Sequence, residues 1–238
     1  MLCGGSGTRL RAVVSDRPKP LAAIDGRSFL ERLLEHLASR GLRRFVLCTG
    51  YRAADIAAER ASFARFGEVV LSEEAEPLGT AGAIANARGS IRSRDYFVFN
   101  GDSFADVDLA AMHRFHVARS AATTLAVVPA RRGEEGGALR LAENGRIVAF
   151  AEKAALTEGA YLNAGVYLMS DRSLADVARG RACSLEREIF PGQVGGGLFG
   201  FVHDGPLVDI GTPERYAGAA AALAAAGLGG PVRRQASD

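Results

Sequence analysis

Lysine is almost missing from this chain of 238 residues. Of its 29 basic residues only two, Lys19 and Lys153, are lysine, and the others are arginine. A compact ammonium and a planar guanidinium differ in shape and hydration, so they do not replace one another at a tight site. The two retained lysines are therefore candidates for specific roles.

Cysteine and long apolar runs are also scarce. Three widely separated cysteines without CxxC spacing argue against a disulfide framework or zinc site and favour a reducing cytoplasm. No run approaches the roughly 20 apolar residues of a membrane helix, and the start does not resemble a signal peptide. The net charge of +2 gives no general attraction to nucleic acid or membrane. We expect a cytoplasmic protein without either partner, whose anion sites are local.

Apolar strands alternate with helical patterns along the first half. Strands are expected at 44–48, 68–72, 96–99 and 123–128, with helices at 28–40, 53–65 and 108–117. This alternation predicts βαβ units and a parallel sheet. The second half is richer in strands, with a hairpin signal around Asn144-Gly145 and strands near 161–169, 199–201 and 207–209.

These patterns predict an α/β fold with a doubly wound, mostly parallel Rossmann-like sheet and a small β-rich insertion. We expect one domain over 1–228, divided into halves at about 1–130 and 131–228, and a flexible tail at 229–238. Ligands of such sheets lie at the carboxyl ends of the strands.

A glycine-rich run opens the chain. Gly4, Gly5 and Gly7 precede Thr8-Arg9, and Pro18-Lys19-Pro20 follows ten residues later. Glycines let backbone amides approach a phosphate or a base closely, because no Cβ intervenes. The run lacks the lysine of a P-loop, and the prolines leave little room for the helix of a dinucleotide fingerprint. A nucleotide site of another type is indicated.

The run resembles the sugar-phosphate nucleotidyltransferase family. The resemblance continues, in the family's order, through five further motifs: Glu76-Pro77-Leu78-Gly79-Thr80, Asn100-Gly101-Asp102, Phe150-Ala151-Glu152-Lys153, Asn163-Ala164-Gly165-Val166-Tyr167 and Asp209-Ile210-Gly211-Thr212-Pro213-Glu214. Both lysines fall inside these motifs. The resemblance implies the nucleotide-diphospho-sugar transferase fold, with a nucleotide-binding first half and a sugar-binding second half.

The reaction implied is attack of a sugar 1-phosphate oxygen on the α-phosphorus of a nucleoside triphosphate, with pyrophosphate leaving. A phosphate monoester is largely dianionic at neutral pH, so this attack needs no general base; it needs positioning, cations and a metal. By resemblance the catalytic residues are Arg9, Lys19, Asp102 and Asp209. Asp102 and Asp209 would hold Mg²⁺, since carboxylate and phosphate oxygens suit that ion.

The resemblance also implies the binding residues. Backbone around the glycine loop would read the base, leaving little trace of base identity in the side chains. The nucleotide contacts would be Leu2, Gly4, Gly5, Gly7, Thr8, Gly79 and Thr80. The sugar-phosphate contacts would be Gly137, Glu152, Lys153 and Asn163. Gly137 departs from the family, because the aromatic residue that often precedes this glycine is Gly136 here.

Within the family, the stretch from Arg9 to Ala22 and the segments His113–His116 and Ser184–Glu186 look most like D-glycero-α-D-manno-heptose 1-phosphate guanylyltransferases. GTP is therefore the favoured nucleotide, for a role in cell-surface glycan biosynthesis. The alternatives are mannose 1-phosphate guanylyltransferase and N-acetylmuramate 1-phosphate uridylyltransferase. A non-catalytic nucleotide-sugar sensor is a different class, disfavoured by the full catalytic set. The sequence does not determine oligomeric state.

The strand before the glycine loop is short. A strand of about five residues is expected there, yet only Met1, Leu2 and Cys3 precede Gly4. Either the natural start lies upstream, or the fold tolerates a shortened strand.

Overall fold

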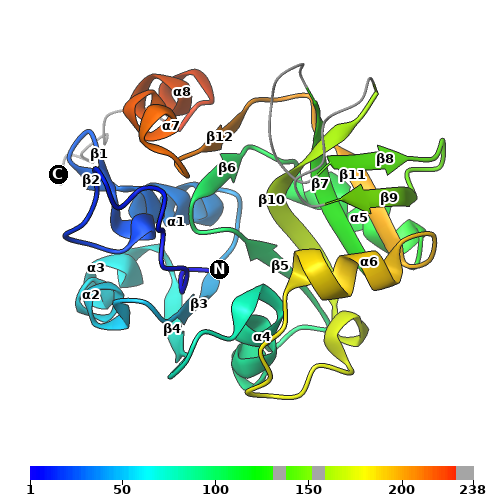
Figure 1. Ribbon diagram of the computed structural model, residues 1–238, viewed down its shortest axis with the longest axis horizontal. Coiled ribbons are helices and arrows are strands. Elements are labelled where there is room, and N and C mark those ends of the chain that lie inside the picture. Colours follow the sequence, from blue (N-terminus) through cyan, green and yellow to red (C-terminus); the bar gives the residue numbers. More distant parts are fainter. Residues whose placement is uncertain (131–137, 152–158, 229–238) are drawn as a thin grey trace, which may run out of the picture.

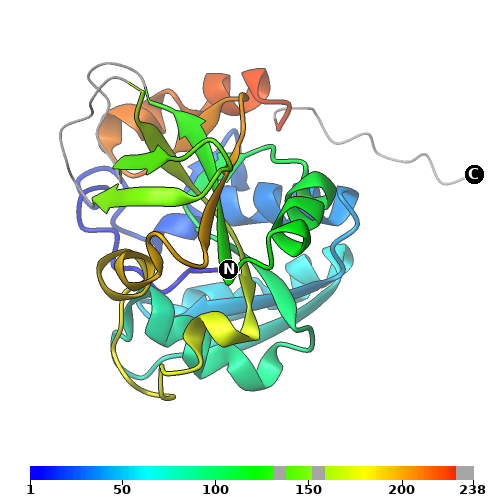
Figure 2. The ribbon, with the colours of Figure 1, turned by 90° about the vertical axis from the view of Figure 1, so that its right-hand side faces the viewer.

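The computed structural model describes residues 1–130, 138–151 and 159–228. Gly137, Glu152, Lys153 and the tail 229–238 lie outside these ranges. Within the ranges, no helix has the length and apolar character needed to cross a membrane. The chain forms a central sheet with helices on both faces (Figure 1, Figure 2).

The central sheet is mixed. Its strands, in spatial order, are β4 (Glu68–Glu73), β3 (Arg44–Thr49), β5 (Asp95–Phe99), β10 (Tyr161–Ser170), β7 (Thr123–Pro129) and β11 (Leu198–Val202). Strands β3 and β4 pair in parallel, as do β7 and β11, whereas β10 runs antiparallel to both of its central neighbours. The predicted α/β class is confirmed, with β10 reversed within an otherwise parallel arrangement.

The first three residues lie between β3 and β5. Leu2 forms parallel bridges with Cys48 on one side and Asn100 on the other. The Leu2 amide donates to Phe99 O at 2.9 Å, and the Cys3 amide donates to Cys48 O at 2.8 Å. This short segment therefore joins the two halves of the sheet and places the glycine run at its carboxyl edge.

Two apolar cores lie on opposite faces of the sheet. On β7, Ala126 and Val128 belong to one core, while Leu125 and Val127 belong to the other. Successive side chains of a strand point to opposite faces, so this alternation separates the cores. Helices α1 (Phe29–Ser39) and α8 (Ala219–Ala225) cover the first core, and α4 (Gly79–Asn86) and α6 (Phe190–Gln193) cover the second.

The helix predicted at 53–65 is broken. The chain forms α2 (Ala53–Ala58), α3 (Arg60–Phe63) and a 3-10 turn (Ala64–Phe66) instead. The Ser62 hydroxyl donates to Glu59 O at 2.7 Å, and a side chain that bonds a nearby carbonyl competes with the helical ladder. Two further helices are α5 (Leu109–Ala118) and α7 (Pro213–Ala217).

Short strand pairs flank the carboxyl edge. The predicted hairpin is present as β8 (Ala138–Leu141) and β9 (Ile147–Ala151), and β8 also pairs with the start of β10. Strand β6 (Ser103–Ala105), which follows β5, pairs antiparallel with β12 (Leu207–Asp209). Strands β1 (Ala23–Ile24) and β2 (Arg27–Ser28) lead into α1. The β6–β12 pair brings Asp209, at the end of β12, close to Asp102, which directly precedes β6.

Candidate active site

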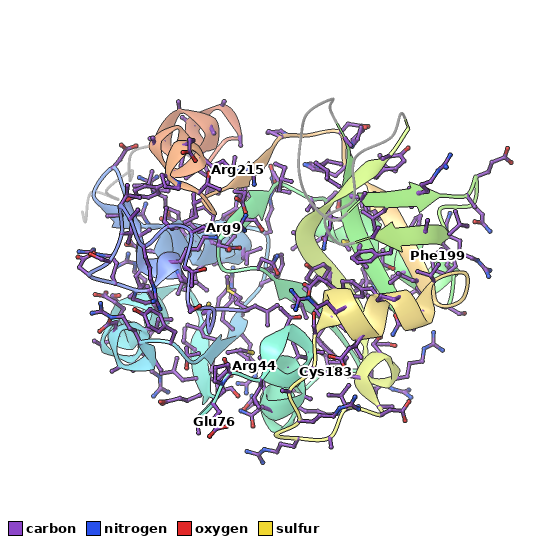
Figure 3. All side chains as sticks on the ribbon, viewed as in Figure 1. Arg9, Arg44, Glu76, Cys183, Phe199 and Arg215 are labelled. Carbon is purple, nitrogen blue, oxygen red and sulfur yellow. The ribbon has the colours of Figure 1, made fainter. Side chains whose placement is uncertain are left out.

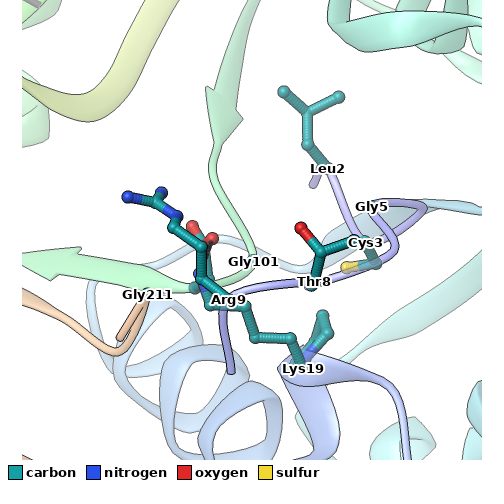
Figure 4. Close-up of a pocket in the computed structure, with 11 residues that line it drawn as sticks. Leu2, Cys3, Gly5, Thr8, Arg9, Lys19, Gly101 and Gly211 are labelled. Carbon is teal, nitrogen blue, oxygen red and sulfur yellow. Dashed lines mark hydrogen bonds and ion pairs between the residues drawn. The ribbon is translucent and has the colours of Figure 1, made fainter. Parts of the chain in front are cut away.

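A pocket opens at the glycine run, where the first three residues meet the end of β5 (Figure 4). It is lined by Leu2, Cys3, Gly5, Gly7, Thr8, Arg9, Lys19, Pro20, Gly101, Asp102 and Gly211. These residues come from the start of the chain, the end of β5 and the end of β12. Leu2, Gly5, Gly7, Thr8, Arg9, Lys19 and Asp102 are thus brought together, as the sequence predicts.

Two glycines are required by close packing around the pocket. Gly101 lies against the Leu2 backbone, and a Cβ added to it would come within 2.6 Å of Leu2 O. Gly7 has a φ of +59°, a left-handed conformation that glycine adopts without steric cost, and it faces the Lys19 side chain. The loop can therefore fold tightly against the strand ends and present its amides to the pocket.

Lys19 points at the end of β5. Its Nζ donates to Asp102 Oδ2 at 2.5 Å, and its side chain is only 10% exposed. Pro18 and Pro20 flank it, and Pro20 is buried, so the backbone on both sides is held. The ammonium is fixed between the glycine run and the acidic strand end.

Asp209 lies beside this ion pair. It is opposite Ser103 in the β6–β12 register, and the Ile210 amide donates to Asp102 O at 3.0 Å. A Cβ on Gly211 would be 2.6 Å from Asp209 Oδ1 and 3.2 Å from Lys19 Nζ, so these two atoms are at most 5.8 Å apart. Asp209 Oδ1 also accepts from Arg215 Nη1 at 3.0 Å.

Asp102, Lys19, Asp209 and Arg215 thus form a row of alternating charges. No set of three or more His, Cys, Asp or Glu side chains suited to a metal occurs among the described residues. Two neighbouring carboxylates, one just before β6 and one at the end of β12, fit Mg²⁺, because that ion takes one or two protein carboxylates and fills its other positions with phosphate oxygens and water.

Arg9 is exposed on the rim of the pocket. Its side chain makes no hydrogen bond or ion pair with the described part of the chain. A guanidinium suits bidentate contact with phosphate, and here it is available to an anionic ligand.

The Asn163 amide has a defined orientation. Its Oδ1 accepts from the Gly165 amide and its Nδ2 donates to the Tyr167 hydroxyl, both at 3.0 Å. Tyr167 is fully buried, and this burial raises its pKa. The β10–β7 register shifts between Asn163 and Tyr167, and such bulges redirect side chains. The Asn100 backbone amide donates to Gly165 O at 2.8 Å, so Asn163 is linked through Gly165 to the Asn100-Gly101-Asp102 segment.

Gly79 and Thr80 begin α4, and they do not line the pocket. Gly79 has a φ of +68° and packs against Cys183 O, which a Cβ would approach to 2.7 Å. The Thr80 hydroxyl donates to Glu186 Oε2 and accepts from the Leu185 amide, both at 2.8 Å. The Thr80 side chain therefore ties α4 to the 183–186 segment.

Glu74 was not identified by the sequence analysis. Its Oε1 lies where a Cβ on Gly4 or on Gly50 would be 2.5 Å away, and its Oε2 accepts from the Leu78 amide at 3.2 Å. Burial raises its pKa, and no lysine or arginine among the described residues pairs with it. Because residues 4 and 50 are glycines, the Glu74 carboxylate fits beside the loop. The sequence analysis could not identify this site residue, because the two glycines come together only in the folded chain.

Comparison with known proteins identifies relatives of this chain. Residues 1–225 match the family described as nucleotidyl transferase. The chain is 36% identical over 220 residues to mannose-1-phosphate guanylyltransferase of Mycobacterium tuberculosis, covering 91% of this chain and 61% of that protein. It is 34% identical over 221 residues to D-glycero-alpha-D-manno-heptose 1-phosphate guanylyltransferase of Aneurinibacillus thermoaerophilus, covering 91% and 94%.

A solved structure is also similar to this chain. The crystal structure of HddC from Yersinia pseudotuberculosis superposes with a TM-score of 0.80 at 30% identity, covering 92% of this chain and 95% of that chain. HddC complexed with GMP-PN gives the same TM-score at 31% identity. The resemblance inferred from the motifs is confirmed: this chain belongs to the nucleotidyl transferase family.

Proposed function

We propose that this protein transfers GMP from GTP to a sugar 1-phosphate, giving a GDP-sugar and pyrophosphate, with D-glycero-α-D-manno-heptose 1-phosphate as the sugar. The observation that carries the proposal is the convergence of the glycine run, Arg9, Lys19 and Asp102 in one pocket, with Asp209 beside it. The heptose guanylyltransferase relative supports this sugar, since the match spans 94% of that protein. Mannose 1-phosphate is the second candidate, from the relative at 36% identity.

In this reaction a phosphate oxygen of the sugar 1-phosphate attacks the α-phosphorus. The bond from that phosphorus to the bridging oxygen breaks, and pyrophosphate leaves with the electron pair. Lys19 would stabilise the charge that develops at the α-phosphate, and Arg9 would hold the leaving phosphates. Asp102 and Asp209 would hold Mg²⁺, which supplies charge neutralisation between the phosphates when bound.

The base would be read beside the glycine loop. Guanine presents two adjacent N–H donors on one edge, and a carboxylate accepts from both at once. Glu74 is a partly buried carboxylate next to Gly4 without a cationic partner in the described residues. Adenine, which presents an acceptor there, and uracil, which presents a single donor, match it less well. Glu74 supports GTP as the nucleotide.

The remaining assignments are also proposals. Asn163 would contact the sugar, together with Gly137, Glu152 and Lys153, which the family motifs imply. Gly79 and Thr80 would shape the base site through the backbone at the start of α4. Residues 1–228 would act as one domain, and use of GTP would place the activity in the cytoplasm.

Pyrophosphate release tests this function. The purified protein, with Mg²⁺, is mixed with each of four NTPs and with heptose, mannose or N-acetylmuramate 1-phosphate. We expect the highest kcat/KM for GTP with heptose 1-phosphate, and loss of release in Asp102→Asn. Release with mannose 1-phosphate alone would favour the second candidate. No release with any pair, despite nucleotide binding, would support a sensor instead.

A further inference from the structure

The two oxygens of the Asp209 carboxylate differ in their surroundings. Oδ1 accepts from the Gly211 amide at 2.8 Å and from Arg215 Nη1 at 3.0 Å. No donor among the described residues bonds Oδ2. A carboxylate held through one oxygen cannot rotate freely, so Oδ2 is the oxygen left to bind another ligand.

The start of α7 places Arg215 next to Asp209. The Thr212 hydroxyl caps this helix by accepting from the Arg215 amide at 3.3 Å, and Pro213 occupies its first turn. The cap sets the position of the Arg215 backbone, and its side chain reaches back to β12. Figure 3 shows Arg215 at the foot of α7, where β12 enters the helix.

The pair borders the proposed metal site. Lys19 Nζ is within 5.8 Å of Asp209 Oδ1, and it is already paired with Asp102. Arg215 is therefore the cation that holds the second carboxylate, as Lys19 holds the first. Partners that hydrogen-bond a ligating carboxylate orient it and tune its metal affinity.

We propose that Arg215 is a positioning residue: by holding Asp209 Oδ1, it fixes the carboxylate and leaves Oδ2 to bind the Mg²⁺ that the proposed function requires. This inference rests on the proposed function. A cation so near a ligating carboxylate also repels the metal ion, and this effect would weaken metal binding where the positioning effect strengthens it. The two effects predict opposite signs when Arg215 is removed, so one measurement separates them.

The test measures Mn²⁺ binding by the electron paramagnetic resonance signal of the free ion. The full-length protein is saturated with a GTP analogue that carries a methylene group between the α- and β-phosphorus atoms, so no turnover occurs. The variants are Arg215→Met, which removes donor and charge, and Arg215→Lys, which keeps both. The control is Arg92→Met, which breaks a surface pair with Glu68 of similar kind.

We expect Arg215→Met to weaken Mn²⁺ binding about 3- to 10-fold, below the usual 10- to 100-fold of such partners because the side chain is 45% exposed. Arg215→Lys should lie near wild type, and Arg92→Met should equal it. Unchanged or tighter binding in Arg215→Met, with Asp209→Asn still weakened, would overturn this inference alone. A wild-type protein that binds Mn²⁺ no better than the analogue does by itself would overturn the proposed metal site, and this inference with it.

Discussion

Lys19 Nζ lies 2.5 Å from Asp102 Oδ2, and the pair joins segments 83 residues apart. One member is the proposed transition-state cation and the other a proposed metal ligand. Their contact means that the cation is held at the proposed metal site before substrates bind. Because Lys19 is 10% exposed, removing either charge leaves the other poorly compensated.

Lys19→Ala should lower kcat far more than it weakens GTP binding. Its charge acts on the developing transition state, and loss of one such group costs about 100- to 1,000-fold in kcat. Steady-state kinetics and calorimetric GTP binding separate the two effects. Lys19→Arg should not restore kcat, since a guanidinium differs in shape and hydration. A loss confined to binding would contradict the assigned role.

Glu74→Gln should reduce discrimination between GTP and ITP. Hypoxanthine lacks the 2-amino group of guanine, so the wild-type carboxylate should favour GTP by roughly 10-fold or more. The amide keeps one acceptor and loses the charge, which should lower that ratio. The measurement is kcat/KM for the two nucleotides, with the exposed neighbour Glu76→Gln as the control. An unaltered ratio would remove Glu74 from the base site.

Tyr167→Phe should raise KM for the sugar 1-phosphate by about 3- to 10-fold, the worth of one hydrogen bond. The hydroxyl accepts from Asn163 Nδ2, and without it the amide loses its fixed orientation. KM for GTP should stay near wild type. Tyr96→Phe is the matched control. Like Tyr167, Tyr96 lies on a strand of the central sheet, β5, and burial raises its pKa to about 12. Equal effects on both substrates would indicate a general structural role.

Arg32→Met should destabilise the protein by about 2 kcal/mol. Arg32 is buried on α1, where it donates to Ile24 O at 2.8 Å and to Leu228 O at 3.3 Å. Hydrogen bonds from charged groups contribute about 1.5–3 kcal/mol each, offset here by the cost of burying the charge. Denaturant unfolding measures the loss. Arg40→Met, which breaks a half-exposed pair with Asp106, should cost under about 1 kcal/mol.

Acid should weaken the fold through His116. Burial lowers the pKa of His116 in the folded state, although Asp95 acts the other way, and Nδ1 lies 2.8 Å from Thr124 Oγ1. The unfolded chain then binds the proton more readily, so stability is present above about pH 6.5 and is lost as pH falls below it. The slope is at most about 1.4 kcal/mol per pH unit for one histidine.

Urea unfolding at pH 7.5 and 5.5 checks this. Burial also lowers the pKa of His36 and of His203, so the difference between wild type and His116→Asn isolates one group. The fall in unfolding free energy should be smaller in the variant. An identical fall would show that the pKa of His116 is the same in the folded and unfolded states.

The sequence by itself determined the family and the alternation of strands and helices, and through the family motifs it indicated most of the residues that line the pocket. Local patterns suffice for these features: glycines that permit close approach, prolines beside a rare lysine, and aspartates that end apolar strands. The reversal of β10 was not predicted, because strand direction depends on which distant strands pair.

The tertiary structure decided which groups each side chain meets. Glu74 lies beside Gly4 because β3, β4 and the first three residues converge. Arg215 meets Asp209 because a capped helix follows β12 directly, and Asn163 is oriented by a tyrosine buried beneath it. These contacts depend on three-dimensional packing. The spacing of residues along the chain does not show the direction in which a side chain points.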